Sequence, residues 1–120
     1  MKFDSLLYRQ IHPSFVQADR VSSQAFRPTE KDQLKLSAYN SEKISADKSL
    51  IHYTTVLNLR SAGVLAVQVD ECQTFGLSAY EDPAPFPEHA LIDYSQINGK
   101  LESIAKSLRA LAEQRGWLAR

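Results

Sequence analysis

The segment INGKLESIAKSLRALAEQRG, residues 97–116, decides the fold class because it has the clearest periodicity in the chain. Its apolar residues recur mostly at intervals of three and four, the spacing that aligns side chains on one face of an α-helix. These residues are Ile97, Leu101, Ile104, Ala105, Leu108, Leu111 and Ala112. We therefore expect an amphipathic helix over about residues 96–115, with Ser95 as its cap, Gly99 as a weak point in its first turn and Gly116 as its end.

An amphipathic helix needs an apolar surface to cover, and strands elsewhere in the chain provide one. The most apolar run, VLAVQV at residues 64–69, is rich in valine and predicts a central strand. Shorter segments with alternating or strand-like composition predict further strands over residues 5–11, 20–26, 35–39, 77–83 and 89–94.

Two shorter helical segments complete the predicted layout. Ser45 is typical of a helix N-cap and starts a second helix over about residues 45–57. Asp70 caps a single helical turn that ends at Gly76. The order of elements predicts one α+β domain over residues 1–120, in which helices cover one face of a single mixed or antiparallel sheet.

The composition is ordinary for one globular domain, since 43% of the 120 residues are hydrophobic and 23% are charged. No apolar run approaches the roughly 18 residues of a membrane span, and residues 1–10 lack the long apolar core of a signal peptide. The single cysteine, Cys72, cannot form an internal disulfide, which agrees with a reducing compartment. We therefore expect a cytoplasmic protein with no membrane partner.

The net charge is zero, but the charges are unevenly distributed along the chain. Residues 1–36 hold six basic and four acidic side chains, residues 37–95 hold three and eight, and residues 96–120 hold five and two. Nucleic-acid-binding domains usually have a clear basic excess. The sequence therefore does not favour a nucleic-acid partner, although it leaves open a basic patch built from the two ends.

Residues that bind metals and phosphates do not occur in their characteristic spacings. The three histidines, His12, His52 and His89, form no metal-binding pair, and no Cys-x-x-Cys occurs. The four glycines are isolated, so neither of the common phosphate-loop patterns occurs. We expect no metal and no cofactor. Cys72 follows an apolar strand and lies beside acidic residues, which favours a buried, unreactive thiol over a nucleophile.

The stretch RVSSQAFRPTEKD, residues 20–32, contains the densest set of candidate ligand contacts. If residues 20–26 form a strand beside the first one, the guanidinium groups of Arg9, Arg20 and Arg27 gather at one sheet edge. Such a cluster would bind a carboxylate or a phosphate. The alternative is structural: Arg27 pairs with Glu30 or Asp32, and the serines only allow close packing.

His89 directly follows a proline-rich loop and begins a predicted strand. A histidine at such a junction either transfers protons or bonds to a backbone carbonyl. Because the sequence shows no partner for proton transfer, the bond to a backbone carbonyl is the favoured interpretation. We assign no catalytic residue. The candidate ligand-binding residues are Arg9, Arg20, Ser22, Ser23, Arg27 and His89.

The segments LYRQIHP, RVSSQAFRPTEKD, LSAY and DPAPFPEHALIDYS, followed by the amphipathic helix, resemble those of a group of short bacterial proteins of unknown function. The similarity consists of an "aF-P…D…LS" block and a "DP-P…P-HA-I" block and covers most of the chain. It implies a bacterial source and an accessory role of the kind encoded in defence or toxin–antitoxin operons, but no activity.

The first strand, with Leu7, Tyr8 and Arg9, is faintly similar to that of compact ADP-ribosyltransferase folds. This similarity implies that Arg9 would hold a pyrophosphate and that an acid at position 81, 82 or 88 would act on the substrate. We favour instead a binding or accessory module for a protein partner or an anionic ligand, because no catalytic pattern is visible. The transferase-like enzyme and a nucleic-acid-associated accessory protein are the alternatives.

Overall fold

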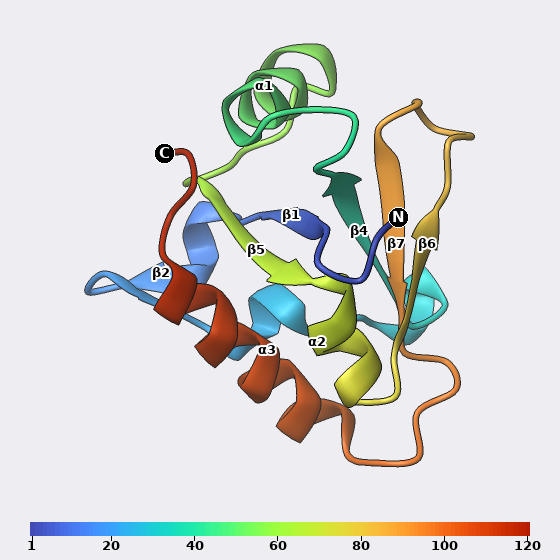
Figure 1. Ribbon diagram of the computed structural model, residues 1–120. Helices are drawn as coiled ribbons and strands as arrows, with labels where there is room; N and C mark the ends of the chain where they lie inside the picture. The colour runs from blue at the N-terminus through green and yellow to red at the C-terminus, as the bar shows by residue number, and fades with distance from the viewer.

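Five antiparallel strands form the central sheet of the computed structural model, which describes residues 1–120 (Figure 1). Their order across the sheet is β5-β1-β4-β7-β6. The strands are β1 (Leu6–Gln10), β4 (Lys35–Asn40), β5 (Val64–Gln68), β6 (Ser78–Glu81) and β7 (His89–Asp93). The α-helices are α1 (Ala46–Ile51), α2 (Val69–Thr74) and α3 (Leu101–Arg115). The α+β class and the antiparallel alternative for the sheet are confirmed.

The register of the strands divides their side chains between two faces. Leu7 of β1 pairs with Asn40 of β4, and Tyr8 pairs with Tyr39. Because successive strand residues point to opposite faces, Leu7 and Tyr8 belong to different layers. Leu7 joins the large core cluster, whereas Tyr8 and Tyr39 join a smaller cluster on the other side. We call these two sides the core face and the groove face.

The core face is covered by α3 and α2, which lie side by side beneath the sheet in Figure 1. The centre of the predicted α3 stripe, Ile104, Ala105, Leu108 and Ala112, is buried here, whereas Leu101 and Leu111 are half-buried and Ile97 lies before the helix. Tyr94 is also fully buried, and its hydroxyl donates a 2.6 Å hydrogen bond to the carbonyl oxygen of Phe26. This bond satisfies the one polar group of the tyrosine, which is what allows its ring to fill the core.

The groove face is only partly covered, by α1 and the π-helix His52–Val56 that continues it. Ala46, Leu50 and Tyr53 from these segments pack against the Tyr8 cluster. The expectation that helices lie on one face only is therefore wrong. Ser45 caps α1 as expected, since its side chain accepts a hydrogen bond from the backbone N–H of Lys48.

Residues 20–26 differ from the predicted strand. Only Arg20–Val21 forms a strand, β3, which pairs with β2 (Val16–Gln17) in a separate two-stranded sheet. Ser23–Phe26 forms a 3₁₀ helix, and the Ser22 side chain caps it by accepting from the backbone N–H of Gln24. The helix buries the neighbours Ala25 and Phe26 together, whereas a strand would send them to opposite faces.

The apolar strand over residues 64–68 is β5, which lies at the edge of the sheet and not at its centre. Its burial comes from covering layers instead, with α3 on the core face and the C-terminal segment beside it. Val64 pairs with Ala119, so the chain end covers part of the free strand edge. Gly63 permits this approach, because a Cβ there would lie 2.7 Å from the carbonyl oxygen of Ala119.

Helix α3 begins later than expected. Lys100 is its N-cap, so Ser95 is not the cap and Gly99 lies before the helix, where it has no helical conformation to weaken. Gly116 ends the helix with a φ of 90°, as expected. None of the helices combines the length and the apolar character needed to cross a membrane.

Candidate functional site

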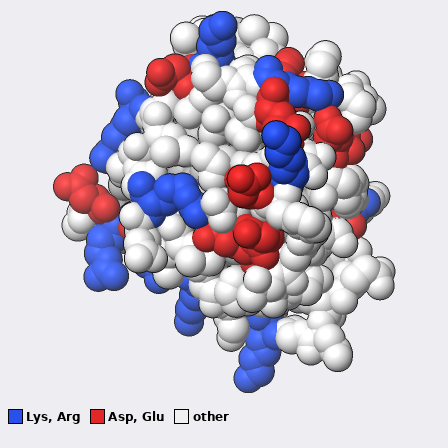
Figure 2. All heavy atoms as spheres, in the orientation of Figure 1, with Lys and Arg blue, Asp and Glu red and all other residues white.

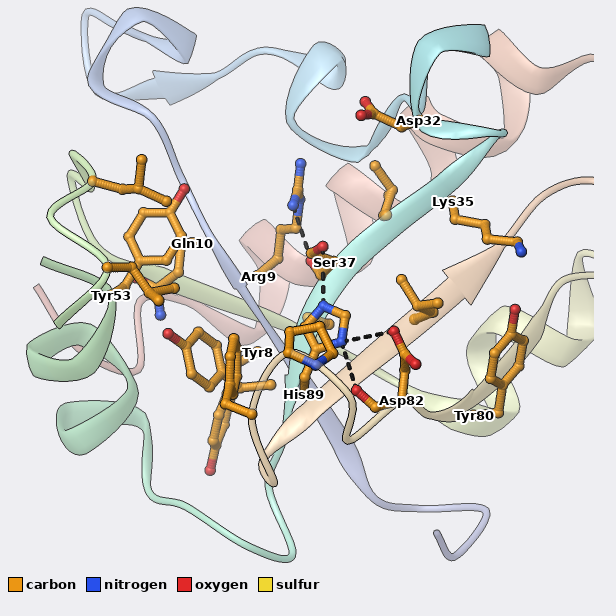
Figure 3. A pocket seen from close by; sticks show the side chains of 18 of the residues that line it. Tyr8, Arg9, Gln10, Asp32, Lys35, Ser37, Tyr53, Tyr80, Asp82 and His89 are labelled. Carbon is orange, nitrogen blue, oxygen red and sulfur yellow. Dashed lines mark hydrogen bonds and ion pairs between the residues drawn. The ribbon is translucent and has the colours of Figure 1, made fainter.

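A groove of about 880 Å³ lies on the groove face of the sheet (Figure 3). Strands β4 and β7 form its floor, the π-helix forms one wall, and the loop between β6 and β7 forms another. We call it the sheet-face groove and define it by six of its lining residues: Arg9, Ser37, Tyr53, Asp82, Phe86 and His89. Two of the six residues predicted to bind a ligand, Arg9 and His89, are therefore brought together.

Arg9 occupies a gap between two strands. The pairing of β1 with β4 ends at Tyr8 and Tyr39, so the strands separate beyond that point, and the Arg9 side chain lies between them (Figure 3). Its Nε donates to the carbonyl oxygen of Ala25 over 2.8 Å, and its Nη1 donates to that of Ser37 over 2.9 Å. These bonds replace strand pairing and hold the guanidinium in one orientation.

The charge of Arg9 has no ion-pair partner, although the more distant carboxylate of Asp32, which also lines the groove, acts to raise its pKa. No carboxylate lies within 4.0 Å of its guanidinium, although Lys43, Arg27, Arg109, Arg115 and Arg120 all have one. Burial lowers the pKa of Arg9, but an arginine stays protonated at physiological pH. No hydrogen bond engages Nη2, and Arg9 lines the groove, so the groove holds a fixed cation with free donors.

His89 is buried, with 6% of its surface exposed, and both ring nitrogens have partners. Nδ1 lies 2.9 Å from the carbonyl oxygen of Asp82 and 3.2 Å from its carboxylate Oδ2. Nε2 lies 3.1 Å from the hydroxyl of Ser37. The contact to the Asp82 carbonyl agrees with the structural interpretation of this histidine. The Ser37 hydroxyl and the Asp82 carboxylate are further partners that the sequence did not reveal.

Aromatic rings line the groove around His89. The Phe86 ring lies 5.1 Å from the rings of both Tyr39 and His89 and 4.7 Å from that of His52. The Tyr39 hydroxyl lies 2.7 Å from Nδ1 of His52, and burial raises the pKa of Tyr39, so the phenol stays neutral. The groove therefore combines flat apolar surfaces with one fixed cation.

The π-helix places Tyr53 on the groove wall. Its widened turn bonds the N–H of Leu57 to the carbonyl of His52, five residues earlier. The hydroxyl of Thr54 donates to the carbonyl of Leu50, and that of Thr55 donates to the carbonyl of Ile51. These side-chain bonds satisfy carbonyls at the change from α to π geometry, a feature that is frequent at functional sites.

The other four predicted ligand contacts lie elsewhere. Arg27 lines a second hollow of about 740 Å³ and forms a 2.8 Å ion pair with Glu102, not with Glu30 or Asp32. Arg20 and Ser22 line a third hollow of about 440 Å³, and Ser23 lines none of the three. The three guanidinium groups do not gather, because residues 20–26 do not run as a strand beside β1.

The acids named for a transferase are also separated. Asp82 lies in the groove, whereas Glu81 pairs with Lys43 over 2.8 Å outside it. Glu88 is not a lining residue, and its carbonyl accepts from the backbone N–H of Asn40. Of these three acids, only Asp82 lines the groove.

The remaining candidates have no arrangement that indicates a site. Burial, and secondarily the acids Glu71 and Asp70, raise the pKa of the Cys72 thiol to about 12. On the face shown in Figure 2, acidic and basic side chains are interspersed and neither forms a continuous patch. Two cations of α3 are paired, Arg109 with Glu113 and Arg115 with Glu71. No three His, Cys, Asp or Glu side chains are grouped to hold a metal ion.

The sequence contained weak signals for the residues that were missed. Ser37 and Tyr39 alternate along β4 with the buried Leu36 and Ala38, which places both on the opposite face. Phe86 is the one aromatic residue in the proline-rich loop before His89. No family model matches the chain, and no match is found among the curated proteins or the solved structures.

Proposed function

We propose that the protein is a binding module whose sheet-face groove takes a small anionic ligand with a flat apolar part. The observation that carries this proposal is the guanidinium of Arg9, which two backbone carbonyls orient and no carboxylate contacts, since Asp32 acts on it only from a longer distance. A guanidinium with free donors recognises a carboxylate or a phosphate through charge-assisted hydrogen bonds.

The walls of the groove favour a planar group next to that anion. Tyr53 and Phe86 present ring surfaces on two sides, and both belong to segments outside the sheet. Rings of this kind bury the flat face of a ligand, while their edges exclude water from the charged contact. A small ligand is favoured over a protein partner because the free cation lies inside a groove and not on an exposed flat surface.

Thermal unfolding with matched probes tests the proposal. Adenosine monophosphate is compared with adenosine, and 4-hydroxybenzoate with 4-hydroxybenzamide, so that each pair differs in charge. An anion at ten times its dissociation constant stabilises the fold by about 1.4 kcal/mol, which raises the melting temperature of a domain of this size by roughly 5 °C. The neutral partners should give smaller shifts.

Two arginine variants locate the binding. Arg9→Gln should abolish the preference for the charged probe, and Arg9→Lys should retain part of it because the charge remains. Arg27→Gln is the matched control, since Arg27 lies outside the groove and already pairs with Glu102. Equal shifts for wild type and Arg9→Gln, or no shift with any anionic probe, would contradict the proposal.

A further inference from the structure

The contacts of His89 determine where its proton lies. Both atoms that face Nδ1 are oxygens of Asp82, at 2.9 and 3.2 Å, and neither a carbonyl nor a carboxylate can donate a hydrogen bond. Nδ1 therefore carries the proton, and in the neutral ring Nε2 has the free lone pair. The Ser37 hydroxyl, 3.1 Å away, donates its hydrogen to that lone pair. A serine, a base and an acid that orients the base thus form one hydrogen-bonded chain (Figure 3).

Regular strands, and not flexible loops, hold this chain together. Tyr39 of β4 pairs with His89 of β7, and Ser37 lies two residues along β4 on the same face, so Ser37 and His89 are diagonal neighbours. Asp82 follows β6, and its backbone N–H donates to the carbonyl of His89 over 3.0 Å. Pro83, which has no backbone N–H to donate, then prevents the pairing from continuing. Such backbone support gives the positional precision that a reactive group needs.

The serine is accessible and its base is not. Ser37 is exposed at the floor of the groove, whereas the His89 ring is buried behind it, in edge contact with Phe86. Arg9 donates to the backbone carbonyl oxygen of Ser37, and both residues line the groove. A bound molecule would therefore meet the hydroxyl and the cation together.

We infer that the sheet-face groove is a hydrolytic site in which Ser37 is the nucleophile, His89 the general base and Asp82 the positioning residue, acting on carboxylic esters that carry an acidic group. This inference rests on the proposed function, because Arg9 would hold the acidic group of the ester. The reaction is a separate claim from anion binding, because Arg9 and the shape of the groove could serve binding alone.

The reaction balances with water as the only co-reactant. The Ser37 oxygen attacks the ester carbonyl carbon while its proton passes to Nε2 of His89, which gives a tetrahedral oxyanion on the acyl carbon. The carbon–oxygen bond to the leaving alcohol then breaks, and His89 returns the proton to that alcohol. Water, deprotonated by His89, next attacks the acyl group on Ser37, releasing the acid and restoring the serine hydroxyl.

The same hydrogen bonds would also tie the β6–β7 hairpin to β4, so the test needs a chemical signal that a structural role does not produce. The first readout is intact-protein mass after exposure to a fluorophosphonate ester, which reacts with activated serines. We expect one adduct per folded chain, located at Ser37 by peptide mapping. Ser37→Ala should carry none, and Ser23→Ala, which alters a serine outside the groove, should react as wild type does.

The variants of the base and of the positioning residue give graded effects. His89→Gln should slow labelling by about 100-fold, the lower range for loss of a general base. Asp82→Asn should slow it by only roughly 10-fold, because the backbone carbonyl of residue 82 still accepts from Nδ1 and keeps part of the orientation of the ring. Each rate is normalised to the folded fraction measured by circular dichroism, so a loss of structure is not read as a loss of chemistry.

The substrate class is tested with two activated esters of similar length, 4-nitrophenyl hemiglutarate, which ends in a carboxylate, and neutral 4-nitrophenyl valerate. Wild type should hydrolyse the charged ester at least about 10-fold faster than the neutral one, because one charge-assisted hydrogen bond contributes a factor of that size. Arg9→Gln should lose that preference. Ser37→Ala should hydrolyse neither ester, yet it should still be stabilised by anionic probes.

Each failure has its own pattern. If the anionic probes stabilise the protein but Ser37 forms no adduct, the groove binds and does not catalyse, which overturns the inference and leaves the proposed function standing. If Ser37 is labelled but no anion binds and the charged ester is not preferred, the proposed function and the assigned substrate class are both wrong. Labelling of Ser37→Ala at the wild-type rate would show that Ser37 is not the nucleophile.

Discussion

The two faces of the sheet come from alternate residues of the same strands, yet they are built in opposite ways. The core face contributes to a cluster of 19 buried residues, whereas the groove face contributes to a cluster of only five. On β4 the core face receives Leu36 and Ala38, and the groove face receives Ser37 and Tyr39. Because the core face buries the apolar surface that stabilises the fold, the groove face is free to position polar groups.

The groove face keeps its polar side chains in place by hydrogen bonds and not by close packing. Arg9, His89 and Tyr39 each have a fixed hydrogen-bond partner, and α1 with the π-helix covers only the part of this face around Tyr39. Substitutions should therefore affect stability mainly on the core face and ligand chemistry mainly on the groove face.

The largest contrast is expected for thiol reactivity. Burial raises the pKa of Cys72 from 9.0 to about 12, so at pH 8 the thiolate should be about a thousandfold scarcer than in the unfolded chain. In Leu91→Cys, which adds a thiol on the groove face, one label per chain should attach quickly and the second only after denaturation, as measured by mass. Rapid double labelling would show that the core face is open.

The same pKa shift should make the free energy of unfolding fall as the pH rises. Because the folded pKa of Cys72 exceeds the unfolded value, the contribution of this thiol to stability is complete below about pH 9 and is lost as the pH rises toward about 12. Burial raises the pKa of Tyr94 in the same direction. Urea unfolding between pH 8 and pH 11 should show this decline.

Leu108→Ala should have the next largest effect, on the free energy of unfolding. Leu108 is fully buried on α3, and truncating such a leucine typically costs about 2–5 kcal/mol. Leu91→Ala is the matched change on the groove face, where the side chain is only half-buried, and should cost clearly less. Equal losses in urea titrations would mean that the two faces are equally packed.

Two tyrosine hydroxyls give a finer comparison. Tyr94→Phe removes the buried bond to Phe26 and leaves that carbonyl unsatisfied, which should cost about 1–3 kcal/mol. Tyr80→Phe removes an exposed 3.1 Å bond to Asp93 and should change stability by less than about 0.5 kcal/mol. A similar loss for both variants in denaturant unfolding would contradict the assigned burial.

The smallest difference is expected between two ion pairs. Arg115 and Glu71 form a bidentate pair with side chains 24% and 17% exposed, and Arg115 also donates to the carbonyl of Ala66. Lys43 and Glu81 form one contact, with 44% and 41% exposed. Double-mutant cycles should give about 1 kcal/mol or more for the first pair and less than about 0.5 kcal/mol for the second.

Most elements of the fold were predictable from local pattern. The strands β1, β4, β6 and β7, the helix N-cap at Ser45 and the stop at Gly116 lie where the sequence placed them. The predictions failed for residues 20–26, where a side-chain cap decided the local structure, and for the position of β5 in the sheet, where a covering segment decided it. Ser22 capped a 3₁₀ helix in place of a strand, and the C-terminal segment allowed an apolar strand to lie at the sheet edge.

The candidate site was less predictable. Arg9 and His89 were chosen for their chemistry and do share a groove, but Arg20, Ser22, Ser23 and Arg27 do not join them. The sequence does not single out Ser37, because nothing near it in the chain shows which histidine will lie beside it. Proximity between residues 52 positions apart depends on strand register, which no local pattern specifies here.

The sequence by itself determined the amphipathic helix, the strand segments and the polar character of one face of β4, because periodicity and capping act between residues close along the chain. Only the tertiary structure decided that β1 and β4 separate around Arg9 and that Ser37, His89 and Asp82 form one hydrogen-bonded chain. Those features depend on how distant strands pair, and pairing is settled by the burial of the whole core face and not by any one segment.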